Sequence, residues 1–424
     1  MVSNQQQANL PSAHSSHTSA DASSDPTLAK AIEILRDLVG FQSISRQSNL
    51  ALIEYVQSYL AGFGITSRLV FNEDRSRANL YATIGPSTRG GLCFSGHSDV
   101  VPVSGQPWTS DPFTLVEREG KLYGRGSADM KGYIACVLAS VPHFVATVRE
   151  LPVHIAISYD EEIGCVGVRD LLAMLADDDA KPIGCIIGEP TSMRLAVAHK
   201  GKHAYRCGVH GLAGHSSQPD KGVNAIEYAA ELITHLRGIG REIRRDGPFD
   251  TAFEPPFTTI QTGTVRGGVA VNVVPDQCVF DFEIRQLPND DGAAHAERLK
   301  AFAMTQLLDD MRAVYPSADI DVTPLSAYPG MQEESSAAAR RLKALCGHAL
   351  GIADLAASGT NTLSFGTEGG LFQEIGIPTL VCGPGAIDQA HKADEFVAIE
   401  QLAQCCTFLK KVVASDLLDA ADGS

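Results

Sequence analysis

The chain lacks the features that mark several whole classes of protein. Basic residues are outnumbered, with 34 Lys and Arg against 50 Asp and Glu, and the formal net charge is −16. Proteins that bind nucleic acid present a basic face, so this balance argues against a nucleic-acid partner. No apolar run is long enough to cross a bilayer, so we expect no membrane association either.

The first residues carry neither positive charge nor a long apolar stretch. No Lys or Arg precedes Lys30, and residues 1–25 are mostly Ser, Gln, Asn, Ala and His. A secretory signal requires a basic start followed by an apolar stretch, and a transit peptide is rich in Arg, so neither is predicted. We expect residues 1–25 to form a disordered tail.

The cysteines show no pattern of a disulfide framework or a sulfur-ligated metal. There are 10 of them and no C-x-x-C pair. Several lie inside apolar runs, namely Cys136, Cys185, Cys278 and Cys382. Such cysteines are typical of buried free thiols in a reducing compartment, which favours a cytoplasmic location.

The order of the expected elements predicts an α/β domain interrupted by a second domain. A chain of 424 residues is too long for one ordinary core, and its 44% apolar and 20% charged content is typical of a globular enzyme. Strands and helices alternate up to about residue 195, with one long helix expected at 131–148. A β-α-β-β-α-β order, with its second helix at 292–313, is typical of a ferredoxin-like unit. We therefore predict the following division: tail 1–25, catalytic domain 26–195, inserted domain 196–327, and catalytic domain again 328–424.

Acidic residues and histidines follow several of the expected strands. His97, Glu189 and His391 each come after an apolar, strand-like run, as does the turn Asp160-Glu161-Glu162, while Asp129 lies just before a helix. Ligands bind at the carboxyl ends of the strands in an open parallel sheet, so these side chains are expected to meet there. Each one alone is explained equally well as an ordinary polar loop residue. Together they predict a metal site.

The residue types suit a pair of catalytic metal ions. Two divalent ions about 3.5–4 Å apart share a bridging ligand and take further N and O ligands. Five side chains, one of them shared, leave a position open for water. Glu161 and Glu162 diverge at a strand end, so one can bind metal while the other accepts a proton from water. Asp99, two residues after His97, can hold the imidazole in one tautomer.

Several longer motifs resemble the dinuclear zinc aminoacylase, desuccinylase and carboxypeptidase family. The likeness runs from about residue 28 to 415. The motifs that carry it are Ser95-Gly96-His97-Ser98-Asp99, Gly124-Arg125-Gly126-Ser127-Ala128-Asp129-Met130-Lys131-Gly132, Asp160-Glu161-Glu162, Gly188-Glu189-Pro190-Thr191, Gly214-His215-Ser216-Ser217, Gly366-Thr367-Glu368-Gly369-Gly370 and the segment from Gly383 to Glu395.

The resemblance assigns a role to each reactive residue. It implies two divalent metal ions, zinc or alternatively cobalt. The implied ligands are His97 and Glu189 for one ion, Glu162 and His391 for the other, and Asp129 as the bridge. It further implies that Glu161 is the general base, that Asp99 orients His97, and that the Asp129–Met130 peptide bond is cis.

The inserted domain resembles the family's lid and dimerisation domain. The resemblance implies a homodimer in which His215 reaches the partner's active site and stabilises the oxyanion. It also implies that Asn272 and Arg285 bind the α-carboxylate of a small N-acyl amino acid. From the residues alone, Arg285 is explained as well by a salt bridge on a strand face.

Within the family, the motifs most resemble members that deacetylate N2-acetyl-L-ornithine in arginine biosynthesis. Gly366, Thr367 and Glu368 are then expected at the substrate, with the Glu368 carboxylate facing the cationic side chain. A favourable charge at a helix N-terminus explains Glu368 equally well. The alternatives are a succinyl-diaminopimelate desuccinylase, a broad N-acyl-amino-acid hydrolase or dipeptidase, and a non-catalytic zinc-binding homologue.

Overall fold

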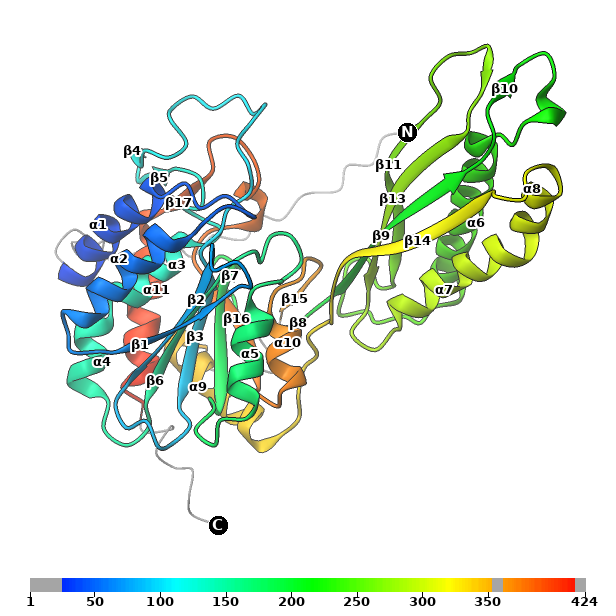
Figure 1. Cartoon of the computed structure of the whole chain (residues 1–424). Coiled ribbons are helices and arrows are strands. Elements are labelled where there is room, and N and C mark those ends of the chain that lie inside the picture. The colour runs from blue at the N-terminus through cyan, green and yellow to red at the C-terminus, as the bar shows by residue number, and fades with distance from the viewer. Residues whose placement is uncertain (1–24, 353–360, 416–424) are drawn as a thin grey trace, which may run out of the picture.

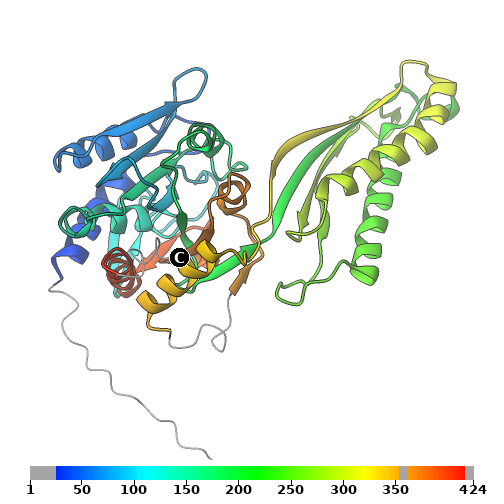
Figure 2. The same cartoon turned by 90° about the horizontal axis from the view of Figure 1, so that it is seen from below.

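The computed structural model describes residues 25–352 and 361–415, which form two lobes joined by two strands (Figure 1, Figure 2). The predicted tail lies outside these residues except for Asp25. That side chain begins the first helix by accepting the backbone N–H of Thr27 at 2.8 Å. Among the described residues, no helix has the length and apolarity that crossing a bilayer requires.

The larger lobe is built on an eight-stranded, mostly parallel sheet. In spatial order its strands are β1 (Ser67–Phe71), β2 (Ala78–Ile84), β6 (Val153–Ser158), β3 (Leu92–His97), β7 (Gly184–Pro190), β16 (Thr379–Gly383), β8 (Ala196–His199) and β15 (Asn361–Leu363). Strands β6, β3, β7 and β16 run parallel, whereas β1 and β2 form an antiparallel edge. Every residue of β3 and β6 is buried, because helices cover both faces of the sheet.

Helices pack on both faces of this sheet (Figure 1). One face carries α1 (Pro26–Gly40), α2 (Leu50–Ala61), α3 (Lys131–Ala139), α4 (Val141–Thr147), α9 (Ala337–Leu350) and α11 (Ile399–Val413). The other carries α5 (Val168–Ala176) and α10 (Gly369–Glu374). A small antiparallel sheet, β17 (Phe396–Ala398), β5 (Lys121–Tyr123) and β4 (Val116–Arg118), completes the lobe.

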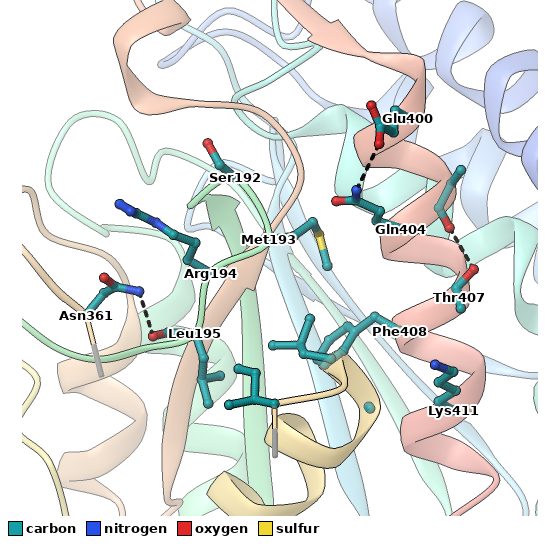
Figure 3. A pocket seen from close by; sticks show the side chains of 14 residues that line it. Ser192, Met193, Arg194, Leu195, Asn361, Glu400, Gln404, Thr407, Phe408 and Lys411 are labelled. Atoms are coloured by element: carbon teal, nitrogen blue, oxygen red, sulfur yellow. Dashed lines mark hydrogen bonds between the residues drawn. The ribbon is translucent and has the colours of Figure 1, made fainter. Parts of the chain in front are cut away.

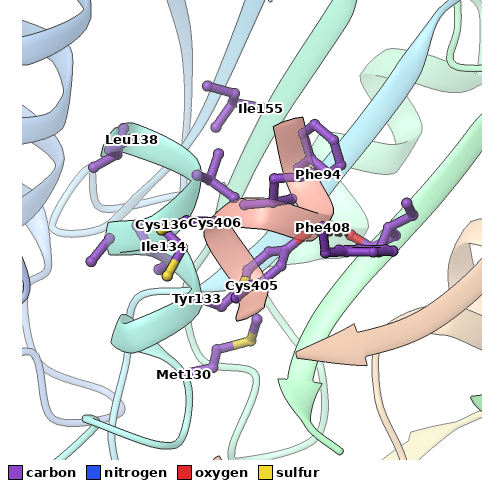
Figure 4. Packing of buried hydrophobic residues seen from close by; sticks show 14 of the residues in the cluster. Phe94, Met130, Tyr133, Ile134, Cys136, Leu138, Ile155, Cys405, Cys406 and Phe408 are labelled. Atoms are coloured by element: carbon purple, nitrogen blue, oxygen red, sulfur yellow. Dashed lines mark hydrogen bonds between the residues drawn. The ribbon is translucent and has the colours of Figure 1, made fainter. Parts of the chain in front are cut away.

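The core of the larger lobe surrounds α3, whose residues are all buried. Figure 4 shows Tyr133 and Cys136 of this helix facing Cys405 and Phe408 of α11. All 10 cysteines of the chain are buried and free, as their place in apolar runs predicted. This packing fixes α3, and therefore the loop with Asp129 that precedes it.

The smaller lobe, residues 201–328, has the predicted β-α-β-β-α-β order. Its antiparallel sheet has the order β11 (Thr259–Gly267), β13 (Gln277–Gln286), β9 (Gly201–His210) and β14 (Asp319–Tyr328). One face packs on α6 (Ala225–Asp246), α7 (Gly292–Phe302) and α8 (Leu308–Val314). The short ribbon of β10 (Gly214–His215) and β12 (Val273–Val274) lies at the end far from the larger lobe (Figure 1).

The fold class is confirmed: a mostly parallel α/β sheet with an inserted ferredoxin-like unit. Strand β8 belongs to the larger sheet and β9 to the smaller, and the domain boundaries at 195/196 and 327/328 stay predictions. Two long helices were predicted wrongly. The helix expected at 131–148 ends near Ser140 and restarts as α4 because Pro142 lies in a first turn. The helix expected at 292–313 is interrupted by a π-helical turn at Ala303–Leu307.

Candidate active site

The predicted ligands meet at the carboxyl ends of the central strands. His97 is the last residue of β3, Glu189 lies near the end of β7, and Glu162 follows β6 by a few residues. Asp129 immediately precedes the start of α3, across a cis peptide bond to Met130, as the resemblance implied. His391 follows β16 and the turn Ile387–Gln389. The sheet topology therefore gathers residues from five separate segments at one edge.

The Asp129 carboxylate lies between the two histidines. Its Oδ1 is 3.1 Å from His97 Nε2, and its Oδ2 is 3.4 Å from His391 Nε2. Beyond Asp129, His97 Nε2 is 3.8 Å from Glu189 Oε1, and His391 Nε2 is 2.9 Å from Glu162 Oε2. The geometry is thus two His–Glu pairs that share one aspartate.

A hydrogen bond at Nδ1 of His97 leaves Nε2 as the ring nitrogen that can bind a metal. Nδ1 lies 2.9 Å from the backbone carbonyl of Asp99, and since a carbonyl only accepts, Nδ1 carries the hydrogen. Nε2 faces the carboxylates of Asp129 and Glu189, and without a metal ion it donates to Asp129 Oδ1 at 3.1 Å. The Asp99 carboxylate is farther away, with Oδ1 at 3.5 Å. The predicted orienting role therefore falls mainly to the Asp99 carbonyl.

The Asp99 side chain instead holds the turn that carries the two adjacent glutamates. Its Oδ1 accepts the backbone N–H of Glu161 at 3.0 Å, and Oδ2 accepts that of Glu162 at 3.4 Å. Oδ2 also accepts the Ser45 hydroxyl at 2.8 Å. Asp99 thus fixes His97 and the glutamate pair relative to one another.

The cluster holds more negative charge than its histidines balance. Burial raises the pKa of Glu161 to about 8 and that of Glu162 to about 7, and it raises the pKa of Glu189 well above its ordinary value. Burial alone would lower the pKa of His97, but hydrogen bonds to Asp129 and Asp99 raise it well above its ordinary value. Carboxylate oxygens crowded around imidazole nitrogens are the ligand atoms that Zn²⁺ or another divalent cation binds.

Two triads of donor atoms lie close enough to hold an ion. The potential ligand atoms of His97, Glu161 and Glu189 lie within 4.8 Å of one another, as do those of His97, Asp129 and Glu162. Glu161 is thus near enough to bind metal as well as to act as a base.

A buried ion pair, which sequence reasoning did not identify, braces the Asp129 loop. Glu395 Oε2 accepts from Arg125 Nη1 at 2.7 Å, and both side chains are 1% exposed. The same carboxylate accepts the backbone N–H groups of Gly126, Ala128 and Asp129 at 2.9–3.0 Å. Glu395 ends the motif that contains His391 and is far from residues 126–129 in the sequence. Sequence reasoning therefore gave no sign of the contact between them.

The cluster opens into a cavity of about 110 Å³ between the two lobes. Its carboxylate wall is formed by Asp129, Glu161, Glu162 and Glu189. The smaller lobe contributes Lys202, Arg285 and Tyr328 to the lining, and the larger lobe adds Gly164, Phe365, Gly366, Ile387 and His391. The predicted substrate residues Arg285 and Gly366 therefore line the same cavity as the reactive cluster, and Lys202 and Tyr328 are additions.

The structure places Thr367 and Glu368 behind the cavity and not on its surface. Thr367 Oγ1 accepts the backbone N–H of Gly369 at 2.9 Å, at the start of α10. Glu368 is 1% exposed and accepts the hydroxyl of Ser158. The expectation that its carboxylate faces the substrate's cationic group does not fit this burial. The cause is the tight turn into α10, which points Glu368 toward the sheet.

His215 belongs to β10, which lies at the far end of the smaller lobe (Figure 1), and Asn272 directly precedes its partner strand β12. His215 is exposed in β10, where its Nδ1 accepts the backbone N–H of Ser217 at 3.1 Å. The Asn272 carbonyl accepts the backbone N–H of Ser216 at 3.2 Å. Within one chain neither residue lines the cavity, so Asn272 cannot share a carboxylate with Arg285 of the same chain.

A larger cavity, of about 650 Å³, lies away from this cluster, between α11 and the segment that joins β7 to β8 (Figure 3). Its lining includes Arg194, Phe408 and Lys411, and among the described residues that line it Glu400 is the only carboxylate and there is no histidine. Those residues cannot hold a metal pair. The smaller cavity is therefore the candidate active site.

Comparison with known proteins finds relatives that match most of the chain. The sequence matches the model of Peptidase family M20/M25/M40 over residues 93–415. An acetylornithine deacetylase from Proteus mirabilis is 36% identical over 383 residues, covering 86% of this chain and 91% of that protein. One from Myxococcus xanthus is 32% identical over 387 residues, covering 90% and 96%.

Solved structures share the fold. An M20 family metallo-carboxypeptidase from Sulfolobus solfataricus superposes with a TM-score of 0.69 at 16% identity, covering 91% of this chain and 98% of that one. A dinuclear metal binding peptidase from Bacillus subtilis gives 0.60 at 16% identity, covering 93% and 99%. At such identities the likeness shows the architecture alone.

Proposed function

The chain belongs to peptidase family M20/M25/M40 and is a metal-dependent amide hydrolase, and we propose that it converts N2-acetyl-L-ornithine to L-ornithine and acetate. The reaction would serve arginine biosynthesis in the cytoplasm. The observation that supports it most is the Asp129 carboxylate, with one oxygen directed at each of two His–Glu pairs. The names of the similar deacetylases support the choice of substrate.

The donor set fits a pair of divalent cations, zinc or alternatively cobalt. His97 and Glu189 would hold one, Glu162 and His391 the other, and Asp129 would bridge them. When bound, such ions supply Lewis acidity, which makes water more acidic and polarises a carbonyl. The B. subtilis structure, described as a dinuclear metal binding peptidase, supports the count of two.

Glu161 would move the proton during the reaction. Its carboxylate lies on the cavity wall, and the only described hydrogen bond to its side chain comes from the Cys165 thiol at 3.4 Å. It takes a proton from the attacking water as the water oxygen bonds to the acetyl carbon. When the C–N bond breaks, Glu161 returns that proton to the departing α-nitrogen. The products are acetate and the free amino acid.

Arg285 would bind the α-carboxylate of the substrate, because its guanidinium faces the carboxylate cluster across the cavity. His215 and Asn272 would come from a second copy of the chain, since their own cavity is out of reach. His215 would then stabilise the oxyanion that forms on the acetyl carbonyl. A homodimer through the smaller lobe follows from this assignment.

A substrate panel with metal analysis tests the function. The purified chain should release acetate from N2-acetyl-L-ornithine faster than from acetylcitrulline, and succinate from succinyl-diaminopimelate more slowly still. Chelation should abolish turnover, and zinc or cobalt should restore it with about two ions per chain. Bound metal without hydrolysis of any substrate would indicate a non-catalytic homologue. A preference for succinyl-diaminopimelate would replace the deacetylase assignment with a desuccinylase.

Mixing two inactive variants tests whether a partner completes the site. Neither His215→Ala nor Glu161→Gln should turn over substrate efficiently alone. In a mixture that exchanges subunits, half the dimers are mixed and each holds one complete site, so activity should rise to about one quarter of wild type. A mixture no more active than its components would show that His215 acts within its own chain or not at all.

A further inference from the structure

Three polar residues form a row across the base of the smaller lobe, where it meets the cavity. Arg285 of β13 and Tyr328 of β14 each lie directly opposite Lys202 of β9. Directly paired residues in a sheet point their side chains to the same face. All three line the cavity, facing the carboxylates of the larger lobe. The row is therefore the wall that a substrate meets on the side away from the metal ligands.

The guanidinium of Arg285 is held from two sides. Its Nε donates to Glu283 Oε1 at 3.1 Å and its Nη2 to Glu283 Oε2 at 3.5 Å. On the other side, Nη1 donates to the Tyr328 hydroxyl at 2.9 Å. A guanidinium has five N–H donors, so these contacts leave one on each terminal nitrogen. That free edge is where a carboxylate binds with two hydrogen bonds, and the Tyr328 hydroxyl lies beside it.

The Tyr328 hydroxyl has a hydrogen left to donate. Its oxygen accepts from Arg285, and among residues 25–352 and 361–415 no acceptor for its own hydrogen lies within hydrogen-bond distance. Burial raises the pKa of this hydroxyl well above its ordinary value, so the hydrogen stays in place. A buried donor without a partner costs stability, unless a bound molecule supplies the acceptor.

The ring of Tyr328 is fixed in this position by Gly366. A Cβ added to Gly366 would lie 2.0 Å from Cε2 of the ring and 2.6 Å from its hydroxyl oxygen, so only glycine leaves room for it. The ring also packs with Cys165 and Met331 in the core of the larger lobe. Tyr328 thus joins Arg285 of one lobe to the core of the other.

We propose that Tyr328 is a substrate-binding residue whose hydroxyl donates to the same carboxylate of the N-acyl amino acid that Arg285 binds. Its oxygen at the same time keeps the free edge of the Arg285 guanidinium turned toward the cavity. This role rests on the proposed function, because it requires a substrate with a carboxylate next to the scissile amide. Lys202 lies on β9, the strand between those of Arg285 and Tyr328. Its Nζ is 3.9 Å from Glu283 Oε2, and it adds positive charge to the same wall.

The test compares Tyr328→Phe with wild type on two substrates that differ only at the carboxylate. The substrates are N2-acetyl-L-ornithine and its α-carboxamide. Loss of a hydrogen bond to a charged group should raise KM for the carboxylate substrate about tenfold or more, with a much smaller change in kcat. The loss on the carboxamide should be clearly smaller, because its uncharged oxygen accepts a weaker hydrogen bond. Equal losses on both substrates would reduce Tyr328 to a packing residue and overturn the proposal.

A binding measurement separates affinity from turnover. In a Glu161→Gln background, which should not consume substrate, calorimetric titration with N2-acetyl-L-ornithine should show about tenfold weaker binding when Tyr328→Phe is added. Zinc content and the thermal midpoint should stay unchanged. Equal affinity with and without the tyrosine hydroxyl would overturn the proposal even if the enzyme is an acetylornithine deacetylase.

Two further variants sharpen the result. Gly366→Ala should displace the ring and reproduce the selective loss on the carboxylate substrate. Tyr55→Phe removes a hydroxyl that donates to Asp37 far from the cavity, and it should change neither substrate's kinetics. If wild type hydrolyses no N-acyl amino acid, the proposed function fails by that assay alone. If it also binds none, the role of Tyr328 fails with it.

Discussion

The two walls of the cavity are built in different ways. On the wall of the larger lobe, the carboxylates belong to segments tied down by backbone hydrogen bonds, as Glu395 and Asp99 show. On the wall of the smaller lobe, the described hydrogen bonds of the Arg285 guanidinium all go to the side chains of Glu283 and Tyr328. The first wall is thus positioned by main-chain donors, whereas the guanidinium of the second is positioned by other side chains. The first arrangement suits groups that act at the reacting bond, and the second suits a group that recognises another part of the substrate.

The difference predicts two kinds of loss on mutation. Changes in the larger lobe should lower kcat or metal content, because they disturb groups at the reacting bond. Changes in the smaller lobe should raise KM, because they remove contacts to parts of the substrate that do not react. A change in the larger lobe that raised only KM, or a change in the smaller lobe that lowered only kcat, would break this division.

The largest effect is expected from Glu161→Gln. The amide keeps the size of the side chain but can neither take a proton from water nor return it, so kcat should fall by about 10²–10⁴-fold. Zinc content should stay near that of wild type, and the exposed Glu54→Gln serves as the control. A variant that loses zinc together with activity would make Glu161 a ligand, a role its place beside His97 and Glu189 permits.

A smaller loss, in metal affinity, is expected from Glu395→Gln. The change leaves the Arg125 charge unpaired and turns an amide N–H₂ toward backbone donors of the Asp129 loop. Removing groups that orient metal ligands typically weakens metal binding by about 10–100-fold. Activity should therefore recover with added zinc, which separates this variant from Glu161→Gln. Activity that stays low at saturating zinc would place Glu395 in the chemistry itself.

In the smaller lobe, Arg285→Lys should change mainly KM. Lysine keeps the positive charge but loses the planar fork that binds a carboxylate with two hydrogen bonds. The expected rise in KM for acetylornithine is about 10–100-fold, from the strength of such bonds, with kcat nearly unchanged. Arg241→Lys, on the exposed side of α6, is the control. A fall in kcat with constant KM would place Arg285 at the reacting bond and break the division between the walls.

The same two walls differ in how far the sequence predicted them. The structure brings His97, Asp129, Glu162, Glu189 and His391 together as the sequence predicted, because each stands at the end of a strand or the start of a helix, where topology decides the position. The fold class was predicted for the same reason, since the change from a parallel α/β pattern to β-α-β-β-α-β is a property of element order.

The place of Lys202 and Tyr328 in the second wall was not predicted, because strand register brings them together. Lys202 and Tyr328 are separated by most of the smaller lobe in sequence, and only the pairing of β9 with β14 makes them neighbours. Glu368 was placed wrongly because a turn of a few residues decides which way a side chain points. Sequence patterns predict well where helices and strands end. They do not predict the strand registers and turns that build the second wall.

The smallest predicted effect is on stability and comes from a buried histidine at the opposite end of the larger sheet. Among the described residues, His154 of β6 makes no hydrogen bond to a carboxylate, and its Nε2 accepts the backbone N–H of Gly91 at 3.2 Å. Burial lowers the pKa of His154 to about 4, whereas acidic neighbours raise that of the equally buried His97. The unfolded chain, with an ordinary histidine pKa of about 6.5, then binds the proton more readily than the folded chain.

The stability contribution of neutral His154 is therefore complete above pH 6.5 and is lost as the pH falls from there through about 4. Between pH 7.5 and 5, this group alone should lower the free energy of unfolding by about 1–2 kcal/mol. His154→Gln removes the titration, so its free energy of unfolding should change less over that interval in urea denaturation. The exposed His348→Gln should keep the wild-type pH dependence. If both variants keep the wild-type pH dependence of the free energy of unfolding, His154 is not the source of the acid sensitivity. The cluster of carboxylates and histidines at the other end of the sheet would then be the next group to test.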